Sequence, residues 1–298
     1  MTFTRSALAV VGSINQDVVL SVADFPLPGQ TLLAGGAVRA TGGKGANQAL
    51  AASMAGARVG MFGCVGEDSG GEDALALLTS YGVNAEGIVR TPQASTGSAY
   101  VCVRGDGENF IVVEAGANAL IRPDRFSAED FAPYGWVLMN LEIPLETVGR
   151  VAELAQQAGC RVALNASPLG GAVPPLEHVD LILANEGEAA QLARSEWGED
   201  AGLAETLGVP TAVITRGARG ATLDAAGTPQ LHASAEAVAV RDTTGCGDAF
   251  AGVLLSRLCA GHSAQQSVQE AARWAAYVAE HEGAAASYPL AFQLARKA

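Results

Sequence analysis

Short apolar runs alternate with segments of helical length along most of this 298-residue chain, and this alternation is the strongest constraint on its fold. The runs are rich in Val, Ile and Leu and have the length of buried strands: Ala7–Val11, Val59–Val65, Trp136–Leu141, Arg161–Asn165, Asp180–Ala184 and Thr211–Thr215. Alanine-rich or amphipathic segments lie between them, near 46–56, 70–80, 146–158, 186–194 and 201–207, and others follow 248 and 264. Strands buried on both faces give such continuous apolar runs. The pattern predicts an α/β fold, a mostly parallel sheet with helices on both faces, with ligands bound beyond the carboxyl ends of the strands.

Two stretches, 13–40 and 94–113, interrupt this alternation, because they contain no helical pattern and are typical of strands joined by turns. Asp106-Gly107 lies between two strand-like segments, Ser98–Arg104 and Glu108–Val113, and predicts a hairpin. We interpret the two stretches as a small β-sheet lid inserted into an α/β core of residues 1–12, 41–93 and 114–298. Because an inserted sheet has edges to cover, we expect the chain to form a homodimer through the lid.

The composition excludes several classes of protein. Hydrophobic residues make up 49% of the chain and charged residues 16%, which excludes a disordered or fibrous protein. The net charge of −13 argues against a nucleic-acid or anionic-membrane partner, although glycine loops can still bind a nucleotide. The five cysteines are scattered, without CxxC spacing, and the N-terminus has neither a signal-peptide pattern nor a membrane span. We therefore expect free thiols and a cytoplasmic location.

The nonapeptide from Asp242 to Phe250 carries the strongest functional signal. Apolar residues recur at helical spacing after it, so a helix is predicted to begin near Gly247. Small residues and the positive end of a helix dipole form a pocket for an anion. Asp248 adds a negative charge there, which suits phosphoryl transfer if the carboxylate accepts a proton from the attacking hydroxyl. A helix start with a favourable acidic residue explains the same sequence.

A second glycine motif, residues 42–48, precedes a helix of very small side chains. It matches neither a Walker A loop nor a Rossmann fingerprint. Of the 18 basic residues only Lys44 and Lys297 are lysines, and Lys44 lies within this loop. Together with Asn47 and Gln48 it suits a polyhydroxylated ligand, although a glycine-rich turn into a close-packed helix remains an alternative.

Further polar residues follow the predicted strands. Asn15 and Asp17 follow the first strand and can hold adjacent hydroxyls, or can form a turn with Asx hydrogen bonds; Glu142 has the same ambiguity. The segment 185–188 can orient Mg²⁺ through water or can cap a helix. The segment 215–220 can approach a nucleotide or can form a hairpin turn. The four histidines lack metal-ligand spacing, and GxSxG and HExxH are absent, so hydrolase and metalloprotease activities have little support.

Taken together, these motifs resemble the PfkB family of carbohydrate kinases, and within it the members that phosphorylate ribose. The matching segments occur in the family's order over nearly the whole chain: Gly12–Asn15, Gly42–Gln48, Ser95–Gly97, Glu114–Asn118, Asn185-Glu186 and Asp242–Asp248. The resemblance implies an ATP-dependent sugar kinase that transfers the γ-phosphoryl group to a primary hydroxyl, with O5 of D-ribose as the expected acceptor. It also implies ATP, Mg²⁺ and a monovalent cation, K⁺, as cofactors.

The resemblance assigns a role to each matching position. Asp248 would be the base, and the N–H groups of Gly245, Cys246 and Gly247 would stabilise the phosphoryl group in transfer. The sugar would be held by Asn15, Asp17, Gly43, Lys44, Asn47 and Glu142. The ATP side would comprise Asn185, Thr215, Gly217 and Gly220, with Glu188 near Mg²⁺. K⁺ would lie near Asp242, Thr244, Gly283 and Ser287.

Three positions depart from the family's pattern. Cys246 replaces the usual alanine, Asn165–Pro168 differs from Asn-Pro-Ala-Pro, and the helix around Ala271–Trp274 offers no recognisable adenine contact. Within the family, 2-deoxyribose, fructose or a nucleoside is an alternative substrate, because motifs do not specify pocket shape. A non-catalytic sugar or nucleotide sensor is the alternative from another class.

Overall fold

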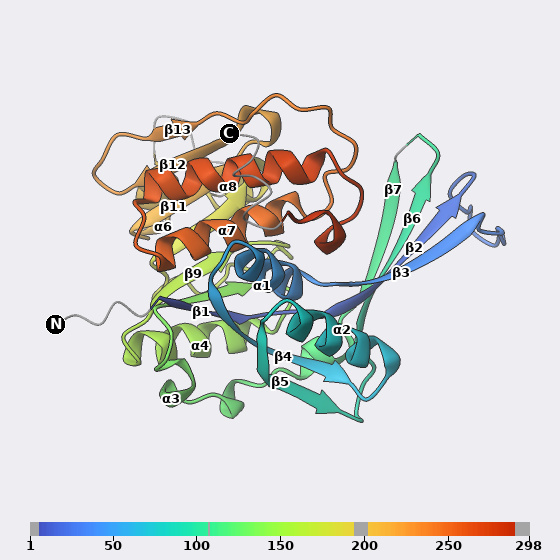
Figure 1. Ribbon diagram of the computed structural model, residues 1–298, viewed down its shortest axis with the longest axis horizontal. Coiled ribbons are helices and arrows are strands. Elements are labelled where there is room, and N and C mark those ends of the chain that lie inside the picture. Colours follow the sequence, from blue (N-terminus) through green and yellow to red (C-terminus); the bar gives the residue numbers. More distant parts are fainter. Residues whose placement is uncertain (1–5, 107, 194–201, 290–298) are drawn as a thin grey trace.

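A nine-stranded sheet forms the centre of the computed structural model, which describes residues 6–106, 108–193 and 202–289 (Figure 1). The strands lie in the order β13-β12-β11-β10-β9-β8-β1-β4-β5. From β11 to β5 all neighbours are parallel, whereas β12 and β13 pair antiparallel at one edge. The bounds are β1 Ala7–Val11, β4 Arg58–Gly66, β5 Asn84–Thr91, β8 Trp136–Asn140, β9 Arg161–Asn165, β10 Leu181–Asn185, β11 Thr211–Thr215, β12 Ala221–Ala225 and β13 Leu231–Ala233. The predicted mostly parallel sheet is confirmed.

The helices cover both faces of this sheet. They are α1 Lys44–Met54, α2 Ser69–Ser80, α3 Ala128–Phe131, α4 Leu145–Gln157, α5 Glu186–Leu192, α6 Leu203–Leu207, α7 Cys246–Cys259 and α8 Ala264–Ala279. Side chains of β1 alternate between two cores: Leu8 and Val10 pack with α1, α2, α7 and α8, whereas Ala9 and Val11 pack with α3 to α6. Burial on both faces explains why the strands have no polar alternation. Residues 194 and 201, included in two predicted helices, lie outside the described residues.

Four further strands form the small sheet, in the order β3-β2-β6-β7, which projects from one end of the core (Figure 1). They are β2 Asn15–Val22, β3 Gly36–Gly42, β6 Gly97–Arg104 and β7 Asn109–Glu114. The outer pairs are antiparallel, as the predicted β6–β7 hairpin requires, but β2 and β6 are parallel because the core intervenes between them in the chain. The strands of the two lid segments therefore lie in one separate sheet, within which β3 and β7 run slightly past the predicted boundaries.

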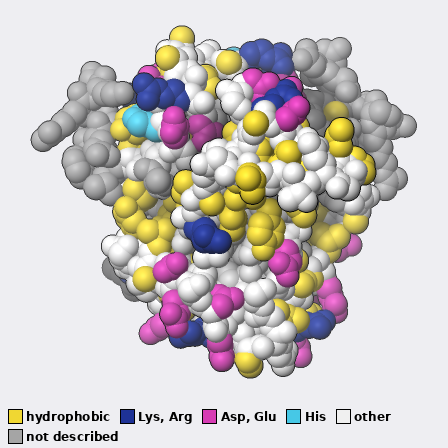
Figure 2. Space-filling view, turned by 90° about the vertical axis from the view of Figure 1, so that its right-hand side faces the viewer, with side chains coloured by type: hydrophobic (Ala, Val, Ile, Leu, Met, Phe, Trp, Pro, Cys, Tyr) yellow, Lys and Arg dark blue, Asp and Glu magenta, His cyan; other side chains and the backbone are white. Residues whose placement is uncertain are grey.

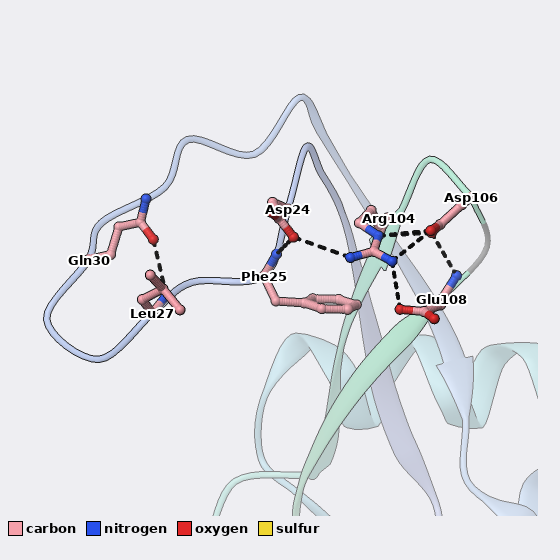
Figure 3. A network of polar contacts seen from close by, with 7 residues as sticks. All are labelled: Asp24, Phe25, Leu27, Gln30, Arg104, Asp106 and Glu108. Atoms are coloured by element: carbon pink, nitrogen blue, oxygen red, sulfur yellow. Dashed lines mark hydrogen bonds and ion pairs between the residues drawn. The ribbon is translucent and has the colours of Figure 1, made fainter.

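A polar cluster ties together the far end of the small sheet (Figure 3). Arg104 at the end of β6 contacts Asp24, Asp106 and Glu108 through its guanidinium, at N–O distances of 3.3, 2.6 and 2.7 Å. The same guanidinium lies 5.3 Å from the centre of the Phe25 ring. Individual exposed ion pairs contribute little, but this network joins the segment after β2 to the β6–β7 turn. The segments 13–40 and 94–113 are thereby connected at this end as well as along the paired strands β2 and β6.

The small sheet also exposes apolar side chains. Its half-exposed residues are Val38, Tyr100, Phe110, Ile111, Val112 and Val113. Figure 2 views the end of the molecule from which this sheet projects, and hydrophobic side chains gather across the middle of that face. All five cysteines are free thiols, as expected. Within the described residues, the helices lack the combined length and hydrophobicity that a membrane span requires.

Candidate active site

Asp248 lies in the first turn of α7, buried against α1, and its carboxylate contacts two consecutive side chains of that helix. Its Oδ1 accepts a hydrogen bond from Gln48 Nε2 (2.9 Å) and its Oδ2 accepts one from Asn47 Nδ2 (3.1 Å). Burial raises the pKa of Asp248, and the charge of Lys44 and the two amides oppose that rise. A carboxylate whose ionised form is destabilised by burial is well suited to accept a proton.

A glycine sets the start of α7. Gly245 has a left-handed backbone (φ 77°), and a Cβ there would lie 2.8 Å from Ala284 and 2.9 Å from the Tyr288 hydroxyl. That hydroxyl donates to the Gly245 carbonyl (3.1 Å). The Cys246 N–H donates to Thr243 O (3.2 Å), whereas the N–H groups of Gly245 and Gly247 have no acceptor within the described part of the chain. Two of the three N–H groups predicted to bind an anion, those of Gly245 and Gly247, are therefore available to donate to a ligand.

The Gly42–Gln48 motif packs its backbone directly on the turn after β1. A Cβ at Gly43, where φ is 88°, would lie 2.7 Å from Asn15 N, and one at Gly45 would lie 2.6 Å from Ser13 O. Glu142 joins the two loops, because its Oε2 accepts hydrogen bonds from the Ser13 hydroxyl and from Lys44 N. The interpretation as a glycine-rich turn into a close-packed helix is therefore confirmed. The same contacts bring Gly43, Lys44 and Glu142, three of the residues predicted to hold the sugar, close together.

Asn15 and Asp17 lie on β2 and not in an Asx turn, so that alternative is wrong. Asn15 Oδ1 accepts a hydrogen bond from Asn118 Nδ2 (2.7 Å), and Asn118 Oδ1 in turn accepts one from Ile14 N. Asn118 belongs to a 3-10 helix, Gly116–Leu120. The sequence contained Asn118 in a matching motif without a role, and the structure gives it one in fixing Asn15.

Asp17 points toward the other acids of this region. Desolvation, followed by the charges of Glu142 and Asp248, raises its pKa from 3.8 to about 6. A Cβ at Gly42 would lie 2.0 Å from the Asp17 carboxylate, so the glycine leaves room for that group. Asp17, Glu142 and Asp248 therefore form one acidic cluster near Lys44, a set of acceptors and one cation that suits a polyol.

The raised pKa of Asp17 predicts a pH-dependent stability. The folded state holds a proton that the unfolded chain releases, so the stability that this proton provides is present below about pH 4 and is lost as the pH rises through about 6. We expect Asp17→Asn to reduce this decline in the free energy of unfolding between pH 4 and 7, measured by urea titration. Asp73→Asn on the exposed face of α2 is the control for loss of one charge. An identical decline in wild type and Asp17→Asn would contradict the assignment.

A cleft of about 890 Å³ lies on the other side of the α7 N-terminus. It is lined by all four residues predicted for the ATP side, Asn185, Thr215, Gly217 and Gly220, and it reaches Cys246 and Gly247. Gly217 and Gly220 lie in the turn of the β11–β12 hairpin, so the hairpin interpretation is confirmed and the same turn lines the cleft. The helix around Ala271–Trp274 showed no recognisable adenine contact in the sequence, but Ala272 of that helix lines the cleft. The apolar wall of the cleft includes Val238, Val240, Ala272, Ala275, Ala276 and Ala279.

Asn185 and Glu188 form a capping box at the start of α5. Asn185 Oδ1 accepts from Glu188 N (2.8 Å), and Glu188 Oε2 accepts from Asn185 N (2.9 Å). Glu186, which lines the cleft, pairs with Arg216 and Arg219. The helix-cap alternative is therefore confirmed. Within the described residues no group of three His, Cys, Asp or Glu side chains is arranged to hold a metal ion.

Asp242 joins the segment before α7 to the segment after α8. Its Oδ1 accepts from the Thr244 N–H and hydroxyl (2.8 and 2.6 Å), and its Oδ2 accepts from Gly283 N (2.9 Å). Burial opposes ionisation, but these hydrogen bonds outweigh it and lower the pKa of Asp242. The Ser287 hydroxyl donates to Ala284 O (2.6 Å). The four residues predicted around K⁺ thus come from two segments that Asp242 ties together.

Comparison with known proteins gives one consistent result. The chain matches the model of the pfkB family carbohydrate kinases over residues 5–291. A ribokinase of Haemophilus influenzae is 34% identical over 294 residues, 96% of each chain, and a deoxyribokinase of Salmonella typhi is 30% identical over 298 residues, 95% of each chain. The structure of Arabidopsis thaliana ribokinase complexed with ribose and ATP has a TM-score of 0.90, with 29% identity and 97% coverage of each chain.

Proposed function

Because this chain belongs to the PfkB family of carbohydrate kinases, we propose that it transfers the γ-phosphoryl group of ATP to O5 of D-ribose, giving ribose 5-phosphate. The observation that carries the proposal is the place of Asp248. It follows Cys246 and Gly247, which line the cleft, and it contacts Asn47 and Gln48 of α1, the helix that follows Gly42 and Gly43. One carboxylate thus lies next to residues of a nucleotide-sized cleft and also belongs to the cluster of acids and amides.

The proposed reaction needs little covalent chemistry from the protein. The hydroxyl oxygen forms a bond to the γ-phosphorus, the bond from that phosphorus to the bridging oxygen of ADP breaks, and Asp248 accepts the hydroxyl proton. The open N–H groups of Gly245 and Gly247 stabilise the charge on the phosphoryl oxygens in transfer. Asp17, Glu142 and Lys44 hold the sugar so that the hydroxyl faces Asp248.

Mg²⁺ fits the ATP side of the cleft, where Asn185 and the acidic first turn of α5 lie. Mg²⁺ keeps much of its hydration and is held in part by phosphates, so a site with few protein ligands suits it. Glu188 would orient it through water, and the ion would neutralise charge on the phosphates. The two segments that Asp242 joins offer hydroxyl and carboxylate oxygens for K⁺, beside the start of α7.

We also infer that the small sheet acts as a lid and as the dimer contact. Its exposed apolar strand β7 supports a partner surface, and a second copy of the chain would cover it. Closure over the sugar would exclude water that otherwise hydrolyses ATP. The five thiols and the use of ATP suit a reducing cytoplasm, which is the location that we infer.

An ADP-release assay over a panel of sugars tests the proposed function. We expect D-ribose to give the highest kcat/KM among ribose, 2-deoxyribose, fructose and nucleosides. We expect K⁺ to increase the rate relative to a buffer without monovalent metal ions. The concentrations of ATP and Mg²⁺ are the same in every assay, and an assay without sugar measures the background hydrolysis of ATP.

The panel separates the alternatives. A preference for 2-deoxyribose, the substrate class of one relative's name, would keep the kinase and change the sugar. Failure of every sugar to stimulate ADP release would contradict the proposal and favour a non-catalytic sensor.

A further inference from the structure

Gln48 is a fully buried polar side chain that the proposed reaction does not use. It is 0% exposed, and its Nε2 donates to Asp248 Oδ1 at 2.9 Å. The adjacent Asn47 donates to the other oxygen, Oδ2, at 3.1 Å. Both carboxylate oxygens are thereby held by side chains of α1, although Asp248 lies about 200 residues further along the chain.

The crossing of α1 and α7 brings Gln48 to this place. A Cβ at Gly252, one turn after Asp248, would lie 2.4 Å from Gln48 O and 2.8 Å from Ala51 Cβ. The two helix backbones therefore approach as closely as a glycine allows, and the buried side chains of α1 are otherwise mostly alanines. Because both partners lie on packed helices, the Gln48–Asp248 distance does not depend on a loop.

The two amides differ in their surroundings. Asn47 borders the Gly43–Lys44 loop, where the sugar is proposed to bind, whereas Gln48 lies one residue deeper and has no exposed surface. Gln48 Oε1, like Asn47 Oδ1, is buried and has no hydrogen-bond partner within the described residues. Most buried polar atoms have a hydrogen-bond partner, but Gln48 Oε1 has none in the described part of the chain. The hydrogen bond from Nε2 to Asp248 is therefore the contact that orients the Gln48 amide.

We propose that Gln48 is a positioning residue, which holds Oδ1 of Asp248 so that Oδ2, on the side of Asn47 and the Gly43–Lys44 loop, faces the acceptor hydroxyl. This proposal rests on the proposed function, in which Asp248 is the base. Gln48 itself contacts neither sugar nor ATP. Its donated hydrogen bond also favours the ionised carboxylate over the protonated acid.

Gln48→Met, which keeps the length of the side chain and removes its donor, tests the proposal. We expect kcat to fall by about 10- to 100-fold, in the range that misplacement of a reacting group costs, with little change in KM for the sugar. The acid limb of the kcat–pH profile moves to higher pH, because the ionised form of Asp248 loses a donor. Gln48→Glu, which adds a like charge beside Asp248, moves the limb further in the same direction.

Gln157→Met is the matched control. Gln157 also donates to a carboxylate, Glu153 Oε1 at 3.1 Å, but on the exposed face of α4. We expect this variant to keep the wild-type kcat and pH profile. Thermal unfolding identifies the variants that fold, and Gln48→Glu replaces Gln48→Met if the latter does not.

A second readout does not require turnover. The Asp248 carboxyl is titrated by ¹³C NMR in wild type and Gln48→Met, with Asp248→Asn identifying the resonance. An upward displacement of the midpoint in Gln48→Met supports the positioning role. An unchanged midpoint, or an unchanged kcat–pH profile in an active and folded variant, overturns it. A wild type that titrates as expected but turns over no sugar would instead contradict the proposed function alone.

Discussion

Replacing Asp248 by Asn is expected to lower kcat by about 10³-fold or more, near the upper part of the range for loss of a general base. The amide has the size of the carboxylate, so the crossing of α1 and α7 is retained. It cannot accept the hydroxyl proton, and its nitrogen would face one of the two amide donors, Asn47 or Gln48. Steady-state kinetics measure the loss, and calorimetry measures sugar affinity, which we expect to change far less.

Asp124→Asn is the control for this change, since Asp124 is exposed in a 3-10 helix, Pro123–Arg125, away from the pocket. It is expected to keep the wild-type rate. A near-normal kcat in Asp248→Asn would remove Asp248 from the role of base. Loss of sugar binding together with activity would show instead that the carboxylate mainly builds the pocket.

The second large effect is expected for Gly45→Ala. Alanine within a helix normally stabilises by about 0.5–1 kcal/mol relative to glycine. At this position a Cβ would lie 2.6 Å from Ser13 O and 2.7 Å from both Gly12 C and Ser13 N, all backbone atoms that cannot rotate away. Overpacking costs about 1–3 kcal/mol, so the steric effect exceeds the helix propensity and the variant is expected to be less stable.

The same displacement would also impair the sugar pocket. It separates the two loops that Glu142 joins through Ser13 and Lys44, so we expect KM for the sugar to rise along with the loss of stability. Urea unfolding measures the free energy, and initial rates measure KM. Gly247→Ala is the control for the unfolding experiment, because a Cβ there meets nothing within 4 Å and the helix should gain stability. Equal stability changes in both variants would contradict the close-approach argument.

Local patterns predicted the parallel strands from β11 to β4 of the large sheet, but not the buried β12 or the edge strands β5 and β13. Strands β1, β4 and β8 to β11 are buried on both faces and gave continuous apolar runs. Strand β5 at one edge is mostly exposed or half-buried and includes Gly87, and β13 at the other edge has three residues, so neither resembled a buried strand. The parallel pairing of β2 with β6 was also missed, because it joins segments separated by the core.

The sequence by itself determined the parallel α/β core, the glycine motifs and the acid at the start of α7, because hydrophobic period, turn residues and helix starts depend on neighbours in the chain. Only the tertiary structure decided that Gln48 as well as Asn47 contacts Asp248, that Asn118 holds Asn15, and that burial near Glu142 and Asp248 raises the pKa of Asp17. These properties arise where distant segments pack together. The close approaches at Gly252 beside Gln48, at Gly97 beside Asn118 and Asn15, and at Gly42 beside Asp17 accompany these contacts, and no local pattern records them.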